Sequence, residues 1–417
     1  MELKKSKIPV NKNHVINRAF YEIVIIGGGP SGICAAISAA RTGRRVLICE
    51  KNERIGRKLL ATGDGRCNLL NEDLNEKHYN LPSRYLVRHV FERFNKEYLL
   101  QFFNNLGLKV YTREDGRIFP ITNQASSVLT VLEIELKKLN IPVEYEFNCN
   151  EIKWSGKDDV IAVSSSSGET IFCHQLIITG GGKTYPALGS DGSTLKLATE
   201  LGHSVIHPVP CAVPIEIKDP LCSRLQGQKI IAEACTVINN LAGDRIRGEL
   251  LFTRYGLSGT AILDISENIS IAINRKKEKN VLVEIDLIPF LSEPELKETL
   301  ILRKQSRLKS DQILVGILPN KISVALKDLF EDKDPDQALK FLKHRLFKVS
   351  GTRGWNEAEF TAGGVCVDEI NPLTLESKLK KNIFFAGEVL DVNGKRGGYN
   401  LAWAWASGLL AGFTGSY

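Results

Sequence analysis

The stretch from residue 21 to residue 50 constrains the fold of this 417-residue chain most strongly. It reads YEIVIIGGGPSGICAAISAARTGRRVLICE, which is an apolar run, a turn of glycines, an alanine-rich segment, a second apolar run and a closing acid. This order predicts a strand, a tight turn, a helix and a second strand. Glycines in the turn let the backbone approach a pyrophosphate, and the helix directs its positive dipole end toward that charge.

A dinucleotide site is therefore the first prediction. Glu50 stands at the end of the second strand, eighteen positions after Gly32, where a carboxylate accepts hydrogen bonds from a ribose. An acid at that position favours a cofactor with a free 2′-hydroxyl group over one with a 2′-phosphate. We assign to this site Gly27, Gly28, Gly29, Pro30, Ser31, Gly32, Glu50 and Lys51.

The C-terminal part carries a second pattern bounded by glycines. Residues 382–386 predict a buried strand that Gly387 and Glu388 close, and Gly397 and Gly398 open a helix. If that helix begins at an isoalloxazine ring, its dipole stabilises the negative charge that develops on a flavin during reduction. Together with the N-terminal turn, this block is typical of FAD proteins rather than of plain NAD dehydrogenases. An ordinary buried strand and helix with glycines at the turns is the alternative.

A basic loop with glycines, RKLLATGDGRCN over residues 57–68, follows the second strand. Its turn can align backbone N–H donors, and its cations can offset the charge of a pyrophosphate. A solvated basic loop is the alternative interpretation. Cys67 has no partner at CxxC spacing, so we expect a packed thiol rather than a redox centre. The cofactor residues assigned in this loop are Arg57, Lys58, Thr62, Gly63, Gly65, Arg66, Cys67 and Asn68.

The middle of the chain changes character twice. Helical periodicity at about 83–106 and 124–139 gives way to short β pieces, and the apolar run 176–178 ends at Thr179, Gly180 and Gly181. This return to a strand and glycines is similar to the crossover of two-dinucleotide-fold flavoproteins, so Gly180 and Gly181 are placed beside the cofactor. Residues 200–290 then predict a separate β-rich domain, and the Leu/Lys-rich residues 292–345 predict a small helical subdomain.

Six blocks occur in an order that resembles one bacterial family. They are IIGGGPSG, GRKLLATGDGRCN, GGKTYPALGSDGS, LFTRYGLSG, FTAGGVCVDEI and FFAGEVLDVNGKRGGYNLAWA. From residue 21 to its C-terminus, the chain is similar to the FAD-dependent oxidoreductases of the aminoacetone-oxidase-like or BaiN-like group. These belong to the flavoproteins of glutathione-reductase type.

The resemblance implies an architecture and a chemistry. The expected fold is α/β: a Rossmann-like, three-layer FAD-binding domain with a parallel central sheet, an inserted β-barrel-like domain and a small helical subdomain. We expect a basic extension over 1–20, the FAD-binding domain over 21–199 and 362–417, the barrel-like domain over 200–291 and 346–361, and the subdomain over 292–345. Non-covalent FAD would pass hydride between a small organic substrate and a redox partner, which is oxygen or transiently bound NADH or NADPH.

The family also implies a distribution of residues along the cofactor. Gly27, Gly29, Gly32 and Glu50 would hold the ADP half. The middle and the flavin side would be lined by Arg57, Lys58, Gly65, Arg66 and Asn68. The ribityl chain and ring would be held by Glu388, Gly397, Gly398, Tyr399 and Asn400.

Catalytic residues follow from no motif. Tyr185, Arg254 and Tyr255 lie in loops bounded by glycines, where a tyrosine could donate a proton and an arginine could bind an acidic substrate. The alternative is that they only pin the domain junction. The usual family pattern has Asn at Asp64, a small residue at Lys183 and often His at Arg254, so we carry over no substrate from any relative.

Bulk composition bounds the remaining classes. The formal charge of +7 comes without a dense basic tract, so nucleic acid is not the expected partner. A flavin-dependent RNA-modifying protein and a non-catalytic FAD-binding regulator are the alternatives. Nine cysteines without a regular framework indicate reduced thiols and a cytoplasmic protein. Residues 1–20 contain no apolar signal segment, and glycines interrupt the apolar run 23–40, so no membrane span is expected.

A metal site is not expected. His203, His207 and Cys211 are spaced four residues apart in an extended context, which would hold their side chains about 13 Å from one another. We therefore interpret the two histidines as partly exposed side chains. The sequence predicts no oligomeric state.

Overall fold

The computed structural model describes residues 20–155, 159–331 and 334–413. The basic extension predicted over 1–20 therefore lies outside the described residues, apart from Phe20. No helix within the described ranges is long and apolar enough to cross a membrane.

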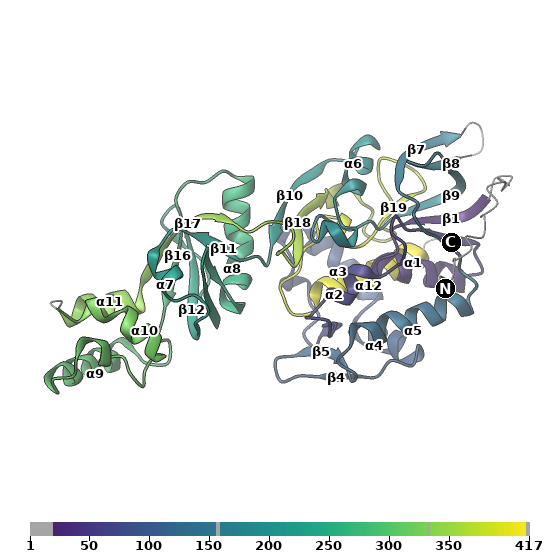
Figure 1. Cartoon of the computed structure of the whole chain (residues 1–417). Helices are drawn as coiled ribbons and strands as arrows, with labels where there is room; N and C mark the ends of the chain where they lie inside the picture. Colours follow the sequence, from purple (N-terminus) through teal and green to yellow (C-terminus); the bar gives the residue numbers. More distant parts are fainter. Residues whose placement is uncertain (1–19, 156–158, 332–333, 414–417) are drawn as a thin grey trace, which may run out of the picture.

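A largely parallel sheet forms the centre of the larger part of the molecule (Figure 1). Strand β1 lies between β2 and β9 and runs parallel to both, while β19 runs parallel to the last residues of β9. These strands are the apolar runs of the sequence, because strands covered on both faces need apolar side chains on both. In spatial order the strands are β6 (Val143–Glu144), β2 (Val46–Cys49), β1 (Phe20–Ile26), β9 (Thr170–Ile178), β8 (Val160–Ser165) and β7 (Cys149–Ser155), with β19 (Ile383–Phe385) beside β9.

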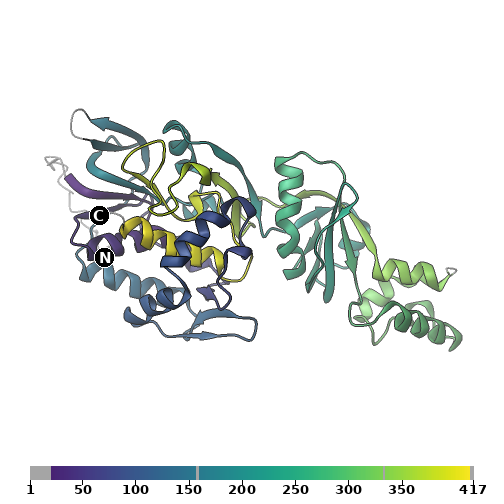
Figure 2. The same cartoon turned by 180° about the vertical axis from the view of Figure 1, so that it is seen from behind.

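The first and last long helices pack directly on each other against this sheet (Figure 2). A methyl group added at Gly408 or Gly412 of α12 would lie only 2.2 or 2.1 Å from a carbonyl oxygen of α1, so glycine permits this close approach. The helices of this part are α1 (Pro30–Arg41), α2 (Arg57–Ala61), α3 (Arg84–Arg93), α4 (Lys96–Asn105), α5 (Ala125–Lys138), α6 (Ser193–Glu200) and α12 (Tyr399–Phe413).

The helical periodicity expected at about 83–106 corresponds to two helices, α3 and α4. Asn95 separates α3 from α4, because its side chain accepts a hydrogen bond from the backbone N–H of Tyr98 (2.9 Å) and so starts a new helix. A small antiparallel sheet lies near these helices. Its strands are β3 (Leu70–Asn71), β5 (Arg117–Pro120) and β4 (Val110–Thr112).

The β-rich segment forms a closed antiparallel barrel. Strand β12 pairs with β14 on one side and with β16 on the other, which closes the ring, and helix α8 packs against β12 and β14. The barrel strands in order are β12 (Lys229–Ile238), β14 (Ile246–Thr253), β15 (Gly256–Ser258), β11 (Ile215–Ile217), β17 (Arg345–Thr352) and β16 (Val281–Asp286), with β13 (Leu241–Ala242) paired outside β12. Two helices belong to this part, α7 (Pro220–Arg224) and α8 (Thr260–Ser270).

Three further helices extend the barrel at the end remote from the large domain (Figure 1). They are α9 (Glu293–Gln305), α10 (Asn320–Ala325) and α11 (Pro335–Lys343). At the end of α11, the ammonium group of Lys343 lies 2.5 Å from the carboxylate of Asp286 at the end of β16, and both side chains are 9% exposed. The parallel sheet, the barrel and these helices confirm the expected fold class.

Strands β10 (Val205–Cys211) and β18 (Phe360–Val365) form an antiparallel pair where the chain passes between the two large parts (Figures 1 and 2). The sequence assigned β10 to the β-rich domain, but β10 pairs with β18 and with no barrel strand in the described part of the chain. The domain boundaries themselves stay a prediction.

Candidate functional site

The glycine turn after β1 has three sterically distinct positions. Gly27 has φ +106°, and a methyl group there would lie 2.8 Å from the carbonyl oxygen of Thr179. At Gly32 a methyl group would lie 1.9 Å from the carbonyl oxygen of Gly27, so this glycine lets α1 pack against the strand. A methyl group at Gly29 would meet nothing within 4 Å. The turn is therefore closed behind Gly27 and Gly32 and open in front of Gly29, where α1 begins.

Glu50 is fixed at the end of β2 by its own hydrogen bonds. One carboxylate oxygen accepts from the backbone N–H of Gly28 (2.8 Å), and the other accepts from the backbone and side-chain amides of Asn52 (2.9 and 2.6 Å). The side chain is 7% exposed. A carboxylate held in this way is pre-oriented to accept hydrogen bonds from a ligand in the space beside it.

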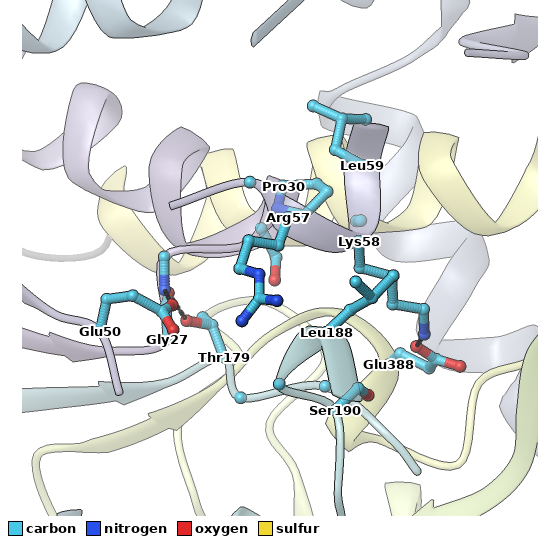
Figure 3. Close-up of a pocket in the computed structure, with 18 of the residues that line it drawn as sticks. Gly27, Pro30, Glu50, Arg57, Lys58, Leu59, Thr179, Leu188, Ser190 and Glu388 are labelled. Atoms are coloured by element: carbon cyan, nitrogen blue, oxygen red, sulfur yellow. Dashed lines mark hydrogen bonds and ion pairs between the residues drawn. The ribbon is translucent and has the colours of Figure 1, made fainter. Parts of the chain in front are cut away.

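A cavity with about 1230 Å³ of empty space, part of it open to solvent, begins in front of Gly29. Glu50 lies toward one side of the cavity and Glu388 toward the other, with Arg57 between them (Figure 3). The predicted residues that line it are Gly27, Gly28, Gly29, Pro30, Ser31, Glu50, Lys51, Arg57, Lys58, Thr62, Gly180, Gly181, Glu388 and Asn400.

The cationic side chains of the cavity differ in how they are held. Arg57 has one hydrogen bond, to the side-chain oxygen of Asn52 (2.9 Å), and its guanidinium group extends toward the cavity (Figure 3). Lys51 pairs with Asp191 at 2.7 Å. Neither Arg57 nor Arg54, which also lines the cavity, has a carboxylate partner among the described residues, so both are available to an anionic ligand.

A compact polar cluster closes the other end of the cavity. The ammonium group of Lys58 lies 2.5 Å from a carboxylate oxygen of Glu388 and donates to the hydroxyl group of Thr184 (2.6 Å). The second oxygen of Glu388 accepts from the backbone N–H of Thr361 (2.8 Å), a residue of β18. The cluster thus joins α2, the end of the parallel sheet and the strand pair that leads to the barrel.

Two hydroxyl groups of the cavity wall lack partners. Ser190 and Thr194 are buried, line the cavity, and have no hydrogen-bond partner for Oγ and Oγ1 among the residues described. Buried polar atoms in folded proteins are nearly always paired, so these two hydroxyl groups are left for a polar ligand or a bound water molecule to pair. The sequence analysis missed both, although the polar turn GSDGS just before α6 was the available signal.

The loop after α2 does not present the row of donors that the sequence suggested. The N–H groups of Gly65 and Cys67 bond to the carbonyl oxygen of Thr62 (3.1 and 3.0 Å), and that of Arg66 bonds to Gly63 (3.1 Å), because the chain turns back on itself there. Cys67 is fully buried, and burial raises the pKa of its thiol to about 12. Gly63, Gly65, Arg66 and Cys67 lie outside the cavity lining, and their contact with a cofactor stays a prediction.

The glycine pair before α12 shapes the wall behind the cavity. The side chain of Asn68 donates to Leu70 (3.1 Å) and accepts from the backbone N–H of Gly398 (3.0 Å), so it ties the basic loop to the start of α12. Gly397 accepts from the side-chain amide of Asn71 (2.9 Å). The ring of Tyr399 stacks on His78 at 4.5 Å. None of Gly32, Asn68, Gly387, Gly397, Gly398 and Tyr399 is in the cavity lining of the described structure.

The candidate catalytic residues are placed differently from one another. Tyr185 has φ +54° and donates its backbone N–H to the carbonyl oxygen of Trp355 (3.0 Å), on the segment that returns from the barrel. Tyr255 lies on the barrel with the guanidinium group of Arg353 over its ring at 4.6 Å. Arg254 is exposed at the turn between β14 and β15 and has no charged partner in the described part of the chain.

The interpretation of His203 as a partly exposed side chain was wrong. This histidine is 3% exposed, and its ring nitrogens lie 2.8 Å from the carboxylate of Glu369 and 2.8 Å from the hydroxyl group of Ser377. Its polar atoms are satisfied by residues distant in the sequence, which local patterning could not reveal. His207 is exposed.

Known proteins resemble this chain along nearly its whole length. A family model described as the HI0933-like protein Rossmann domain matches residues 21–414. A Clostridium scindens protein named 3-dehydro-bile acid delta(4,6)-reductase is 35% identical over 405 residues, which cover 94% of this chain and 98% of that protein. A ribosomal RNA dihydrouridine synthase of Escherichia coli is 31% identical over 400 residues, 93% of this chain and 96% of that protein.

Solved structures resemble it more distantly. The 3-ketosteroid-delta4-(5alpha)-dehydrogenase of Rhodococcus jostii RHA1 has a TM-score of 0.49 at 15% identity, covering 97% of this chain and 99% of that one. A flavocytochrome c3 fumarate reductase in an open conformation has a TM-score of 0.47 at 14% identity, covering 98% and 82%.

Proposed function

We propose, from the premise that the chain belongs to the HI0933-like family of Rossmann-domain flavoproteins, that it is an FAD-dependent oxidoreductase. The family match over residues 21–414 confirms the resemblance that the six sequence blocks indicated. The cofactor, its residues and the reaction are our inference from the site.

The cavity supports FAD through the chemistry of its walls. The open side of Gly29, at the start of α1, suits a pyrophosphate group, because unpaired helix N–H groups and the helix dipole favour negative charge there. Arg57 adds a positive charge beside it, and Glu50 suits a ribose. The convergence of the open helix start, Arg57 and Glu50 on one cavity is the observation that carries the proposal, and the unpaired hydroxyl groups of Ser190 and Thr194 add polar atoms to its wall.

When bound, FAD would supply the hydride chemistry, and the chain would supply binding and orientation. Lys58 is held by Glu388 and Thr184, so its position is defined before any ligand enters. The start of α12 places a helix dipole near the same end of the cavity, where it would favour negative charge on a reduced ring.

For the substrate we propose a carbon–carbon double bond conjugated to a carbonyl group. The names of the two relatives support this class, because each describes saturation of such a bond. One is a delta(4,6)-reductase of a 3-keto acid, and dihydrouridine is uridine whose ring double bond has been saturated. We propose NADH or NADPH as the reductant.

A second candidate substrate is a uridine in RNA. The E. coli relative favours it, since its similarity extends over 93% of this chain and so includes the barrel and the helices beyond it. The two candidates share the reaction and differ in the molecule that carries the double bond.

The first experiment is the visible spectrum of the purified protein, before and after anaerobic NADH or NADPH. An oxidised-flavin spectrum that bleaches promptly would support an FAD-dependent reductase and identify its donor. The reduced protein would then be offered 4-androstene-3,17-dione in one arm and unmodified ribosomal RNA in another, with mass spectrometry of the products. A protein that takes up no flavin, even with added FAD, would refute the proposal.

A further inference from the structure

We propose that Tyr185 is the proton donor of this site, and that its phenol protonates the carbon next to the carbonyl group while the substrate double bond is saturated. The inference rests on the proposed function and adds to it the residue that completes the reaction.

Tyr185 occupies a constrained position at the edge of the site. The residue before it, Thr184, is buried and takes part in the cluster with Lys58 and Glu388. The backbone of Tyr185 is left-handed (φ 54°, ψ 63°), which is uncommon for a residue other than glycine and concentrates at functional sites. Its N–H bond to Trp355 holds this conformation, so the segment returning from the barrel fixes the tyrosine.

The phenol of Tyr185 is available as an acid. The side chain is half-buried, and its hydroxyl group has no hydrogen-bond partner within the described ranges. Burial raises the pKa of the phenol, and the nearby carboxylates of Glu359, Asp64 and Glu357 raise it further. Glu359 itself lines the cavity. Tyr185 is not itself in the cavity lining of the described structure, but its phenol is within electrostatic reach of Glu359, which is, and it keeps its proton at neutral pH.

Tyr255 is chemically similar but is already engaged in the barrel. Arg353 covers its ring and is paired with Glu357 (2.7 Å) and Glu216 (3.3 Å). These contacts fit the alternative considered from the sequence, in which such a residue pins the junction. Tyr185 directly follows Thr184 of the polar cluster, whereas Tyr255 lies in the barrel beneath Arg353, so we assign the role to Tyr185.

The reaction balances with one hydride and one proton. FAD, when bound and reduced, would supply a hydride for the carbon remote from the carbonyl group, and the electron pair of the double bond would then move to the carbon next to the carbonyl group. That carbon takes the proton of the Tyr185 phenol, and the phenolate regains a proton from water at the cavity mouth. The reducing equivalents come from a reduced nicotinamide, or from dithionite in the test below.

The test follows the return of oxidised-flavin absorbance. Wild type, Tyr185→Phe and Tyr255→Phe are loaded with FAD, reduced with dithionite without oxygen, and mixed with 4-androstene-3,17-dione or 2-cyclohexen-1-one. We expect Tyr185→Phe to slow reoxidation by the enone about 100-fold or more, while FAD content and reoxidation by oxygen stay as in wild type. The wild-type rate falls as pH rises through the raised pKa of the phenol, Tyr255→Phe keeps this dependence, and Tyr185→Phe loses it.

A second variant covers the case in which Tyr185→Phe fails to fold or to bind FAD. Asp64 is 95% exposed with φ +54°, a conformation that asparagine tolerates equally well, so Asp64→Asn should fold normally. It removes one carboxylate that raises the pKa of Tyr185. The high-pH fall of the enone reaction should therefore move to lower pH.

Each negative result would refute a different claim. Reoxidation by enone in Tyr185→Phe within threefold of wild type, or an unmoved pH dependence in Asp64→Asn, would overturn the assignment of Tyr185. A reduced wild type that reacts with oxygen but with neither enone would refute the conjugated-ketone class and the donor together, and would leave FAD in place. A wild type without flavin would refute the proposed function itself.

Discussion

The glycine turn allows a sharp separation of cofactor binding from folding. Gly29 precedes α1 with φ −82° and ψ −175°, a conformation that alanine adopts without strain, and a methyl group there meets nothing within 4 Å. In Gly29→Ala, the poorer helix cap and the smaller entropy of the unfolded chain act in opposite directions, each by up to about 1 kcal/mol. The stability of the FAD-free protein should therefore change by less than about 1 kcal/mol.

The same methyl group should weaken FAD binding. It occupies the open space in front of the helix start, where we place the pyrophosphate, and so keeps that group from the backbone N–H groups. Hydrogen bonds to charged groups contribute about 1.5–3 kcal/mol each. Loss of one such bond predicts a dissociation constant about 10- to 150-fold higher, because each 1.4 kcal/mol is a factor of about ten.

Gly32→Ala is the matched control, because it adds the same methyl group three residues along the same turn. There the new carbon would lie 1.9 Å from the carbonyl oxygen of Gly27 and 2.7 Å from the hydroxyl oxygen of Thr179. Since the first obstacle is backbone, α1 must move, and overpacking of this kind costs about 1–3 kcal/mol or more. This variant should lose stability whether or not FAD is present.

Urea unfolding of the FAD-free proteins and FAD titration by flavin fluorescence measure the two effects independently. We expect Gly29→Ala to keep the wild-type urea midpoint and lose affinity for FAD, and Gly32→Ala to lower the midpoint. FAD binding to Gly29→Ala within twofold of wild type would refute the placement of the pyrophosphate. A lowered midpoint in Gly29→Ala would refute the open space in front of it.

Three other predictions follow from buried polar groups. Replacing Ser190 and Thr194 together by alanine should leave the FAD-free protein equally or more stable and raise the dissociation constant of FAD about 5- to 150-fold, because each lost hydrogen bond contributes about 0.5–1.5 kcal/mol. Urea unfolding and FAD titration measure the two effects, and an unchanged affinity would contradict the prediction. Burial raises the pKa of Glu267 in the folded protein, so stability is lost as pH rises from about 4.5 through that raised value. The melting temperature of Glu267→Gln should therefore vary less with pH between pH 4.5 and 8 than that of wild type. A melting temperature that falls more steeply with pH in the variant would contradict this direction. Asp286→Asn should destabilise the protein by about 3–5 kcal/mol, because it leaves Lys343 buried without its carboxylate partner. The double variant Asp286→Asn with Lys343→Met should recover part of that loss in urea unfolding. An equal loss of stability in the single and the double variant would contradict the coupling of this pair.

Local sequence predicted the part of the site that depends on the turn after β1 and on the end of β2. Gly27 follows from its positive φ of +106°, Gly32 from its close approach to the carbonyl oxygen of Gly27, and Glu50 from its place at a strand end. The same locality predicted the parallel strands, because strands buried on both faces must be apolar.

Long-range contacts account for what the sequence did not predict. Ser190 lines the cavity because the loop before α6 folds over Gly181, and the polar turn GSDGS signals a loop there without showing which residues it approaches. The turn around Gly63 resembles an anion-binding loop in composition, yet its N–H groups are consumed by its own carbonyl groups. His203 shows the same limit, since its partners lie more than 160 residues along the chain.

The contact between α1 and α12 also sets the order in which the protein can be completed on the ribosome. The helix against which α1 packs is synthesised about 360 residues later, which at ~5–20 residues per second is a delay of about 20 to 70 s. The barrel, by contrast, is formed by one continuous stretch of chain from β11 to β17. It can close while the domain of the parallel sheet still lacks α12. During that interval, the face of α1 that later packs on Gly408 and Gly412 of α12 is uncovered. Chains truncated before α12 should therefore be the aggregation-prone species of this protein, and chaperones the factors that handle them.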